Sequence, residues 1–378
     1  MAMAHQPTLL FLTNSTEALR CYWQPLFAHM QAAGWRVLCC VPHAALAAGQ
    51  APFCPRGCTL LGYPLDAKGC SALHDARTVW ALCKIMRQER PDMLLAATIK
   101  SVIYGGIAAQ LAPVPRYGAV ITGLGYAFEG DTVPKRLLRW FVSRLYGFAL
   151  RRAGIIFFQN SADAEEFSQR GIVGKDQPIA LCKGAGVDCT HFSAAPAVIE
   201  KPVFLLMARL LVAKGIAVYA QAAQQLKQRY PQARFCLLGQ SMQGRGALDP
   251  ADLCRWQQAG DIEYWGECRD VRPFVRQASV LVLPSWREGT PASILEGMAM
   301  GRAAVVSDVP GCRDAVREGI NGFVVPPRDS VALALALEKF IQEPALIERM
   351  GQAARRIACE EFDANKVAAG MVARMPFG

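Results

Sequence analysis

Two carboxylates in the rear half of the chain have the setting of a ligand site. Glu288 follows an apolar run with small residues at the turn, and Glu296 lies inside the segment of helical character that comes next. Carboxylates accept hydrogen bonds from hydroxyl groups, which a sugar or a ribose offers in pairs. The backbone N–H groups of residues 292–295 should point outward at the helix start, where phosphate oxygens bind readily. The alternative is a strand, a glycine turn and a solvated helix with two surface acids.

Strands and helices must position these side chains. Along most of the chain, apolar runs that suit strands alternate with stretches of helical character. Such alternation predicts βα units and parallel sheets. Residues 193–202, poor in charge and containing proline, separate two series of these units, so we expect two doubly wound halves with a cleft between them. The predicted strands are 8–12, 36–41, 93–97, 118–121 and 154–158 in the front half and 203–207, 235–238, 262–264, 280–283, 304–306 and 322–325 in the rear half, and a helix is predicted over 19–34.

The composition fits two globular domains. The chain has 378 residues, of which 52% are hydrophobic and 19% charged, which excludes a disordered chain or one small module. The net charge is +10, and most of the excess lies before residue 196. A basic front half favours a partner rich in phosphate, whether a nucleic acid, an anionic lipid or a phosphorylated small molecule.

The cysteines and histidines do not form metal motifs. Fourteen cysteines are scattered without a Cys-x-x-Cys pair, and five histidines have no ligand spacing. We therefore expect a protein of the reducing cytosol without structural zinc, without another metal and without a cofactor. The apolar run 9–12 is too short for a signal peptide, and no run of about twenty apolar residues exists, so neither secretion nor a membrane span is expected.

Motifs in the rear half resemble the signature of the retaining glycosyltransferases of family 4. The resemblance implies the GT-B fold, in which two doubly wound Rossmann-like domains face a central cleft, and it implies transfer of a sugar from a nucleotide donor with retention at the anomeric carbon. The matching segments are Val280–Pro327, which contains both carboxylates, Met207–Gly215, which is similar to the family's Gly-Arg-Leu-x-x-x-Lys-Gly element, and Gly186–Asp188, which is similar to the motif before the second domain.

Two cations of the rear half could bind the diphosphate of such a donor. When the bond between the anomeric carbon and the diphosphate breaks, negative charge grows on the leaving group. Arg209 and Lys214 could converge on that diphosphate as hydrogen-bond donors and charges, although two surface cations would look the same. By resemblance, Glu296 binds the ribose and Glu288 the transferred sugar. The predicted catalytic residues are Arg209, Lys214 and Glu288, and the predicted donor-binding residues are Arg209, Lys214, Gly239, Gly266, Val271, Glu288, Ser293, Ile294, Leu295 and Glu296.

The base of the nucleotide is expected at residues 265–271, which are similar to the family's Gly-x-x-x-Asp-Val loop. Main-chain groups of this loop can read the edge of a uracil, and Gly266 lets the backbone approach it. The segment equally fits a plain connection between a strand and a helix, and Gly239 equally fits a turn.

Stretches of the front half resemble a narrower branch of the family, which builds capsules, O-antigens and other glycans on undecaprenyl diphosphate. The similarity covers residues 98–105 and 121–128 and continues through 135–152, where cations alternate with aromatic residues. A basic amphipathic helix with aromatic side chains suits an anionic membrane face, and the alternative is a core helix with solvated cations. The predicted membrane-contacting residues are Arg136, Arg139, Trp140, Arg151 and Arg152.

The predicted acceptor-binding residues are Asn14, Lys100 and Thr122. Lys100 could contact an acceptor diphosphate or only cap a strand end. This sequence departs from the family at two of these positions. Thr122 stands where many members have a histidine that contacts the transferred sugar, and Asn14 begins an Asn-Ser-Thr stretch where the family has a glycine-rich loop.

The sequence thus predicts a retaining glycosyltransferase that moves a hexose or an N-acetylhexosamine from a UDP-sugar to a polyprenyl-diphosphate-linked acceptor. We expect a cytoplasmic protein peripheral on the inner face of the cytoplasmic membrane. The predicted domains are residues 1–195 for the acceptor and 196–360 for the nucleotide sugar, with 361–378 returning to the first domain.

Three alternatives stay open at this point. A related GT-B enzyme could act on a soluble acceptor. A nucleic-acid-binding protein fits the basic balance but lacks a recognisable motif, so no nucleic acid is expected as a partner. A nicotinamide oxidoreductase fits two doubly wound halves, but Phe128 stands where the third glycine of the fingerprint that begins at Gly123 should be.

Overall fold

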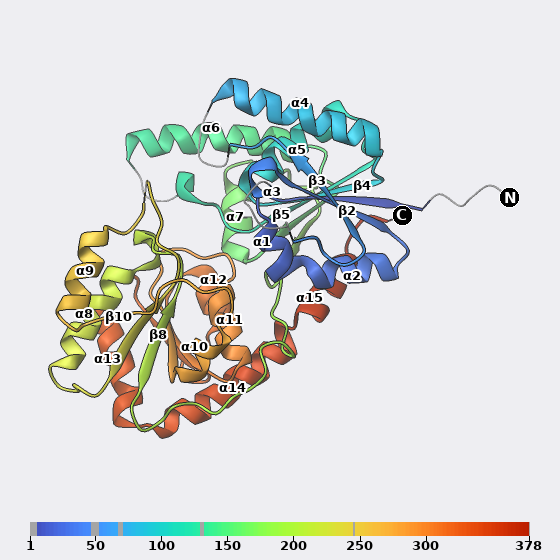
Figure 1. Ribbon diagram of the computed structural model, residues 1–378. Coiled ribbons are helices and arrows are strands. Elements are labelled where there is room, and N and C mark those ends of the chain that lie inside the picture. The colour runs from blue at the N-terminus through green and yellow to red at the C-terminus, as the bar shows by residue number, and fades with distance from the viewer. Residues whose placement is uncertain (1–5, 47–52, 67–70, 129–131, 245, 378) are drawn as a thin grey trace. The chain divides into compact units, whose positions relative to one another are not determined.

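The structure, a computed structural model, describes residues 6–46, 53–66, 71–128, 132–244 and 246–377. The chain folds into two compact units (Figure 1). Unit 1 contains residues 1–185 and 364–378, and unit 2 contains residues 186–363.

Unit 1 is built on a sheet of seven parallel strands in the order β3-β2-β1-β4-β5-β6-β7. Its central strands are mostly apolar because helices cover both faces of the sheet. Side chains of β1 alternate accordingly: Leu10 and Leu12 belong to one core, and Leu9 and Phe11 to the other. The strands are β1 (Thr8–Leu12), β2 (Arg36–Pro42), β3 (Cys58–Tyr63), β4 (Met93–Ala97), β5 (Arg116–Ile121), β6 (Ile155–Phe158) and β7 (Ile179–Leu181).

The helices of unit 1 divide between these two cores. α4, α5, α6 and α7 contribute to the core of Leu10 and Leu12, and α2 and α15 to the core of Leu9 and Phe11. The helices are α1 (Thr16–Ala18), the π-turn η1 (Leu19–Trp23), α2 (Gln24–Ala32), α3 (His43–Leu46), α4 (Ala72–Glu89), α5 (Ile99–Leu111), the 3-10 turn η2 (Tyr126–Phe128), α6 (Val133–Leu150), α7 (Ser161–Gln169) and α15 (Ala364–Val372).

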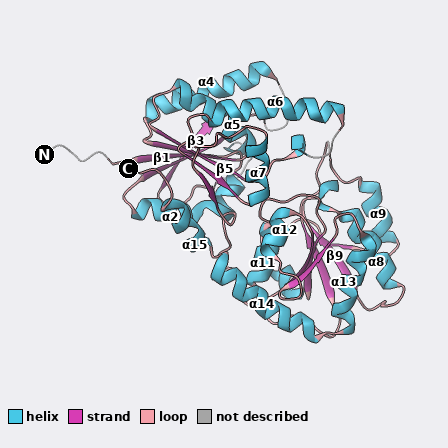
Figure 2. Ribbon diagram, turned by 180° about the vertical axis from the view of Figure 1, so that it is seen from behind, coloured by secondary structure: helices cyan, strands magenta, loops and turns pink. Residues whose placement is uncertain are grey.

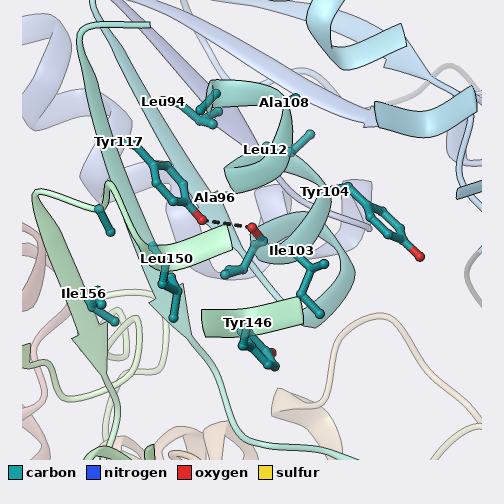
Figure 3. Close-up of a cluster of buried hydrophobic side chains, with 14 of the residues drawn as sticks. Leu12, Leu94, Ala96, Ile103, Tyr104, Ala108, Tyr117, Tyr146, Leu150 and Ile156 are labelled. Carbon is teal, nitrogen blue, oxygen red and sulfur yellow. Dashed lines mark hydrogen bonds between the residues drawn. The ribbon is translucent and has the colours of Figure 1, made fainter. Parts of the chain in front are cut away.

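Helix α5 is largely buried because α4 and α6 pack against it on the sheet. Figure 3 shows part of this core, with the Tyr117 hydroxyl donating a hydrogen bond of 2.9 Å to the carbonyl of Val102. Gly106 of α5 lies directly against the backbone of α6, since a Cβ there would overlap the carbonyl oxygen of Ala149. The close approach fixes α6 on unit 1 and determines which of its side chains face outward.

Three local features of unit 1 differ from the prediction. Strands β3 and β7 were not expected; β3 is half-exposed and β7 has only three residues, so neither has a long apolar run. The helix expected over 19–34 begins instead with the π-turn η1, and it continues as α2, whose second residue is Pro25. A proline has no N–H to continue the α-helical hydrogen bonds. The backbone forms the wider π-turn in the residues shortly before this proline.

Unit 2 repeats the architecture with six parallel strands in the order β10-β9-β8-β11-β12-β13. Figure 2 shows the strands of each unit as a layer between helices. The strands are β8 (Val203–Met207), β9 (Arg234–Leu238), β10 (Glu263–Tyr264), β11 (Val280–Leu283), β12 (Ala303–Ser307) and β13 (Gly322–Val325), and the helices are the 3-10 turn η3 (Val212–Lys214), α8 (Ile216–Lys227), α9 (Pro250–Gln258), α10 (Arg272–Gln277), α11 (Ala292–Ala299), α12 (Pro310–Ala315), α13 (Ser330–Gln342) and α14 (Ala345–Glu361).

Each sheet has a point where the strand order reverses. In unit 1 this point lies between β1 and β4, and in unit 2 between β8 and β11. Loops that leave the two strands at such a point diverge to opposite faces, so the carboxyl edge there is open to a ligand. The predicted fold class, two doubly wound Rossmann-like domains, is confirmed.

The chain passes from unit 1 to unit 2 at residues 185/186 rather than at 195/196, and returns at 363/364 rather than at 360/361. Residues after Gly186 belong to unit 2 because they bond to α14 and the residue after it. The N–H of Val187 donates to the carbonyl of Phe362 at 2.7 Å. The Arg355 guanidinium donates to the carbonyls of Cys189 and Phe192 at 2.8 and 2.7 Å.

Arg302 is the largest fully buried side chain of the chain's described part, with no exposed surface. Burial lowers the pKa of its guanidinium to about 10. A buried charge is tolerated when its hydrogen bonds are all made. The guanidinium donates to the carbonyl oxygens of Val275, Ala195, Met300, Pro196 and Arg276 at 2.7–3.3 Å.

We predict that Arg302→Ala lowers the free energy of unfolding of unit 2 by about 3 kcal/mol or more, because several buried carbonyls lose their donor. Urea unfolding measures the change. Arg276→Ala is the control, because its exposed side chain should contribute less than about 0.5 kcal/mol. Equal losses in both variants would contradict this account.

Candidate active site

The predicted donor residues lie at one edge of the sheet of unit 2. Arg209 follows β8, Gly239 follows β9, Gly266 follows β10 and Glu288 follows β11. The carboxyl ends of parallel strands meet at the same edge, and β8 and β11 are the pair at which the strand order reverses. The structure therefore brings these four positions to the part of the sheet where doubly wound domains hold ligands.

The loops after β8, β9 and β10 lie close together at Gly239. The N–H of Gly239 donates to the carbonyl of Gly266 at 2.8 Å. A Cβ at Gly239, whose φ is +151°, would overlap the carbonyl oxygen of Ala208. The close approach thus requires a glycine at position 239, whereas Gly266 has open space around its Cα and a left-handed backbone with a φ of +77°.

Lys214 and Glu288 form an ion pair at the reversal point, with 2.5 Å between Nζ and Oε1. Both side chains are largely sheltered, with 21% and 10% of their surface exposed. The prediction placed Lys214 on a diphosphate and Glu288 on a sugar. In the structure, each of these two groups neutralises the other.

Backbone contacts between the loops after β8 and β11 produce this pair. The N–H of Trp286 donates to the carbonyl of Ala213 at 2.9 Å. Next to it, Gly215 has a φ of +72°, and a Cβ there would overlap the carbonyl oxygen of Pro284. Lys214 lies between Ala213 and Gly215, and Glu288 lies two residues after Trp286. The packing of the two loops therefore sets the distance between the charges of Lys214 and Glu288.

Arg209 is exposed at the same edge. Within the described ranges, no hydrogen bond or ion pair joins its guanidinium to another residue. A planar guanidinium presents a fork of N–H donors that matches phosphate oxygens. Arg209 is therefore a cation of the edge that can accept an external anion without giving up a partner in the protein.

Glu296 lies in α11 and is partly buried. Removal of its carboxylate from water raises its pKa to about 7. The carboxylate lies near the loop after β10: burial raises the pKa of the Cys268 thiol, and the charges of Asp270 and Glu296 add to that shift. The structure therefore brings Glu296 next to the loop predicted to hold the base.

The expectation that the N–H groups of residues 292–295 all point outward is wrong for two of them. The N–H groups of Ile294 and Leu295 both donate to the carbonyl of Pro291, at 3.0 and 3.1 Å, and their side chains are buried. Pro291 precedes the first helical residue, so the helical hydrogen bonds already begin at Ile294. Ser293, partly buried in the first turn, stays at the helix start as predicted.

Val271 is the residue before α10, which begins with Arg272 and Pro273. Its side chain is partly buried in the core that also contains Cys268 and Phe274. Asp270 of the same loop forms an ion pair of 2.8 Å with Arg272, and that hydrogen bond lowers the pKa of Asp270 to about 2. The loop from Gly266 to Val271 is thus anchored at its end by packing and by a local ion pair.

The predicted acceptor residues lie at the corresponding edge of unit 1. Asn14 follows β1 and is exposed, Lys100 lies in the first turn of α5 after β4, and Thr122 follows β5. Lys100 Nζ donates to the carbonyl of Asp66 at 2.6 Å. Asn14 and Lys100 follow the two strands of the reversal point, β1 and β4, and Thr122 follows the next strand of the sheet.

Sequence reasoning missed a polar network under this edge. The Tyr63 hydroxyl donates to the carbonyl of Thr13 at 3.2 Å and lies 3.3 Å from the Ser101 hydroxyl. Thr98 donates to Ser101 at 3.2 Å and has a φ of +80°, which a residue with a branched Cβ adopts only under strain. Such strain gathers at functional sites, but no sequence pattern signals it.

Helix α6 and the two residues after it contain the predicted membrane residues. Arg136, Trp140, Arg151 and Arg152 are exposed, and Arg139 is partly buried. A groove of about 880 Å³ runs between α6 and residues 170–177, and it is lined by cations and aromatic rings. No helix of the described residues has the length and apolarity to cross a bilayer.

We predict that Glu296→Gln stabilises unit 2 in a pH-dependent way. The folded pKa of about 7 lies above the ordinary value of 4.5, so ionisation costs the folded state free energy. That cost is absent below about pH 4, grows between the two pKa values and is constant above about pH 8. The variant should match the wild type at pH 4 and be more stable by about 3 kcal/mol at pH 8. Thermal unfolding across this range measures the difference, and a constant difference would contradict the account.

Comparison with known proteins agrees with this geometry. Residues 19–180 match the model of the glycosyl transferase 4-like domain, and residues 201–343 match that of the glycosyl transferases group 1. The chain is 27% identical to N,N'-diacetylbacillosaminyl-diphospho-undecaprenol alpha-1,3-N-acetylgalactosaminyltransferase of Campylobacter jejuni over 76% of this chain and 77% of that protein. It is 24% identical to UDP-Gal:alpha-D-GlcNAc-diphosphoundecaprenol alpha-1,3-galactosyltransferase of Escherichia coli over 75% of each chain.

Among solved structures, sucrose-phosphate synthase of Thermosynechococcus elongatus superposes with a TM-score of 0.80 at 18% identity, over 97% of this chain and 98% of that one. At this identity the similarity shows the fold. The two family models together span most of both units, and their boundary lies in the connection between them. The chain is therefore a glycosyltransferase of the GT-B fold and belongs to the family-4 glycosyltransferases that include transferases of lipid-linked glycan assembly.

Proposed function

We propose that this protein is a retaining glycosyltransferase that moves a hexose or an N-acetylhexosamine from a UDP-sugar to a saccharide linked to polyprenyl diphosphate. The reaction takes place on the inner face of the cytoplasmic membrane. The observation that carries the proposal is the gathering of Arg209, Lys214, Glu288 and Glu296 around the carboxyl edge of one sheet. Cations for a diphosphate and carboxylates for hydroxyls are the groups that a nucleotide sugar requires.

The donor is bound by exchange of partners at this edge. The diphosphate meets the exposed Arg209 first and then competes with Glu288 for Lys214. Once Lys214 turns to the diphosphate, the Glu288 carboxylate is free to accept hydrogen bonds from the sugar hydroxyls. Glu296 accepts those of the ribose, and the loop around Gly266 receives the uracil.

The bond from the anomeric carbon to the diphosphate oxygen breaks while the acceptor hydroxyl oxygen attacks the same face of the sugar. Its proton passes to the departing phosphate oxygen, so the products are the glycoside and UDP. Arg209 and Lys214 stabilise the negative charge that grows on the leaving group. Attack on the face that the leaving group vacates retains the configuration.

The choice of acceptor rests on the relatives and on unit 1. The Campylobacter and Escherichia proteins named above act on saccharides carried by diphosphoundecaprenol, and each matches three quarters of this chain. Lys100 provides a cation for a diphosphate at the acceptor edge, beside Asn14 and Thr122.

The surface of α6 supports attachment to a membrane. Its exposed apolar side chains are Val133, Leu137, Trp140, Phe141 and Phe148, with exposed fractions between 49% and 76%. The cations of the helix lie among them, and the helix contains no acidic residue. Aromatic rings at the interface and cations on lipid phosphates bind a protein to an anionic bilayer without spanning it.

A transfer assay tests the proposed reaction. UDP-glucose, UDP-galactose and their N-acetylhexosamine analogues are each incubated with a short-chain polyprenyl diphosphate that carries one N-acetylhexosamine. One donor should yield a glycoside with the anomeric configuration of the donor, read by NMR. A product of inverted configuration would refute the retaining mechanism, and release of UDP without a glycoside from any donor would refute the acceptor.

We predict that Arg209→Ala and Lys214→Gln each reduce kcat by a factor on the order of 10²–10³, because each removes a cation from the leaving group. UDP release under saturating substrates measures the effect. Lys201→Ala changes an exposed cation of unit 2 away from this edge and should leave kcat unchanged. Activity near that of the wild type in both site variants would remove their role.

We predict that replacing Arg136, Arg139, Arg151 and Arg152 together by Ala releases the protein from vesicles of phosphatidylglycerol and phosphatidylethanolamine. Each cation near an anionic surface contributes about 1 kcal/mol, so partition should fall on the order of a hundredfold or more. Co-sedimentation at moderate salt measures it.

The control replaces four exposed cations of unit 2, Lys201, Arg276, Arg349 and Arg356, by Ala. The net charge of this variant equals that of the α6 variant. Equal loss of vesicle binding in both would mean that total charge, not α6, holds the protein to the membrane. Unchanged binding of the α6 variant would favour a soluble acceptor.

A further inference from the structure

A second groove lies in unit 1, apart from the one beside α6. It has a volume of about 500 Å³, within the range of small-molecule sites. Three segments form it: the start of α3, the residues after β3 and the first half of α4. The side chains with chemistry are those of His43, Asp66, His74, Arg77 and Trp80.

The groove belongs to the acceptor edge of the sheet. His43 directly follows β2 and Pro64 directly follows β3, so the groove lies at the carboxyl ends of two neighbouring strands. Lys100, from the reversal point between β1 and β4, donates to the carbonyl of Asp66 on the groove wall at 2.6 Å. The wall itself is fixed, because the Thr78 hydroxyl donates to the carbonyl of Pro64 at 2.8 Å. A preformed groove therefore continues from the residue expected to meet the acceptor.

Trp80 provides the groove with an exposed aromatic surface. With 67% of its surface exposed, it is the most exposed of the chain's tryptophans, most of which are buried or half-buried. An exposed indole at the rim of a groove is a flat apolar platform, and a pyranose ring has an apolar face of C–H groups that packs on such a platform. The polar edge of the same ring needs donors and acceptors around it.

Those groups are present in the groove. Arg77 and Trp80 both lie on α4, almost one turn apart, and His74 precedes them by another turn, so the three side chains line the same wall. His43 lies on the opposite element, its ring against Gly62, where a Cβ would overlap it. Imidazole and guanidinium N–H groups donate to sugar oxygens, and the Asp66 carboxylate accepts from hydroxyls.

We propose that this groove binds a pyranose ring of the acceptor saccharide, stacked on Trp80 and held by Arg77 and the two histidines, while Lys100 meets the diphosphate to which the saccharide is linked. The inference rests on the proposed function, since it assumes a lipid-linked acceptor. It adds that unit 1 reads the saccharide as well as the lipid diphosphate.

Two probes separate these contributions: farnesyl diphosphate, and farnesyl diphosphate linked to one N-acetylhexosamine. Their dissociation constants are measured by calorimetry in detergent, without a membrane. The wild type should bind the glycosylated probe on the order of tenfold more tightly. Trp80→Ala should abolish that preference and leave the affinity for bare farnesyl diphosphate unchanged. Leu111→Ala, which removes an exposed apolar side chain at the last residue of α5, away from the groove and from α6, should keep the preference.

Each other outcome has a defined meaning. Equal affinity of the wild type for both probes, or a preference that survives Trp80→Ala, overturns the groove assignment. If Trp80→Ala weakens binding of both probes alike, or weakens only binding to vesicles, Trp80 contacts the lipid rather than the sugar and the assignment is likewise wrong. If neither probe binds although UDP still raises the melting temperature, the lipid-linked acceptor itself is refuted, and with it the inference.

Discussion

The close approach of two loops at the reversal point of unit 2 is the constraint on which the proposed donor site depends. Gly215 lies so near the carbonyl of Pro284 that no side chain fits between them. Only a glycine combines that distance with the left-handed backbone at this position. The contact holds a lysine after one strand against a glutamate after another, and it converts two distant motifs of the sequence into one charged site.

Much of this architecture follows from patterns that are local in the sequence. All six strands of unit 2 were predicted, because most of them are apolar runs in an alternating series. Strand β3 was missed because it is an edge strand with half-exposed side chains, and η1 because a π-turn has no apolar signature. The residue types of the donor edge could be predicted from their motifs. Their pairing could not, because the ion pair between Lys214 and Glu288 depends on loop packing across the sheet.

In unit 1, the structure reveals more of the candidate site than the sequence motifs predicted. Its motifs point to only three residues at the edge, whereas the structure adds a strained Thr98, a buried network around Tyr63 and a groove beside α4. These features come from segments far apart in the chain that meet at the strand ends. A sequence records the residue types there but not their juxtaposition, so the recognition of the second substrate is the part of function that depends most on the fold.

The pairing of Lys214 with Glu288 also bears on selectivity. A cation with an internal counterion attracts passing anions weakly, since the two charges nearly cancel at a distance. Inorganic phosphate would have to displace the glutamate and leave it sheltered without a partner, which costs free energy. A ligand that supplies hydroxyls along with its phosphates compensates the displaced acid at the same moment. We therefore expect the occupied lysine to favour a ligand that carries both phosphates and hydroxyls over inorganic phosphate.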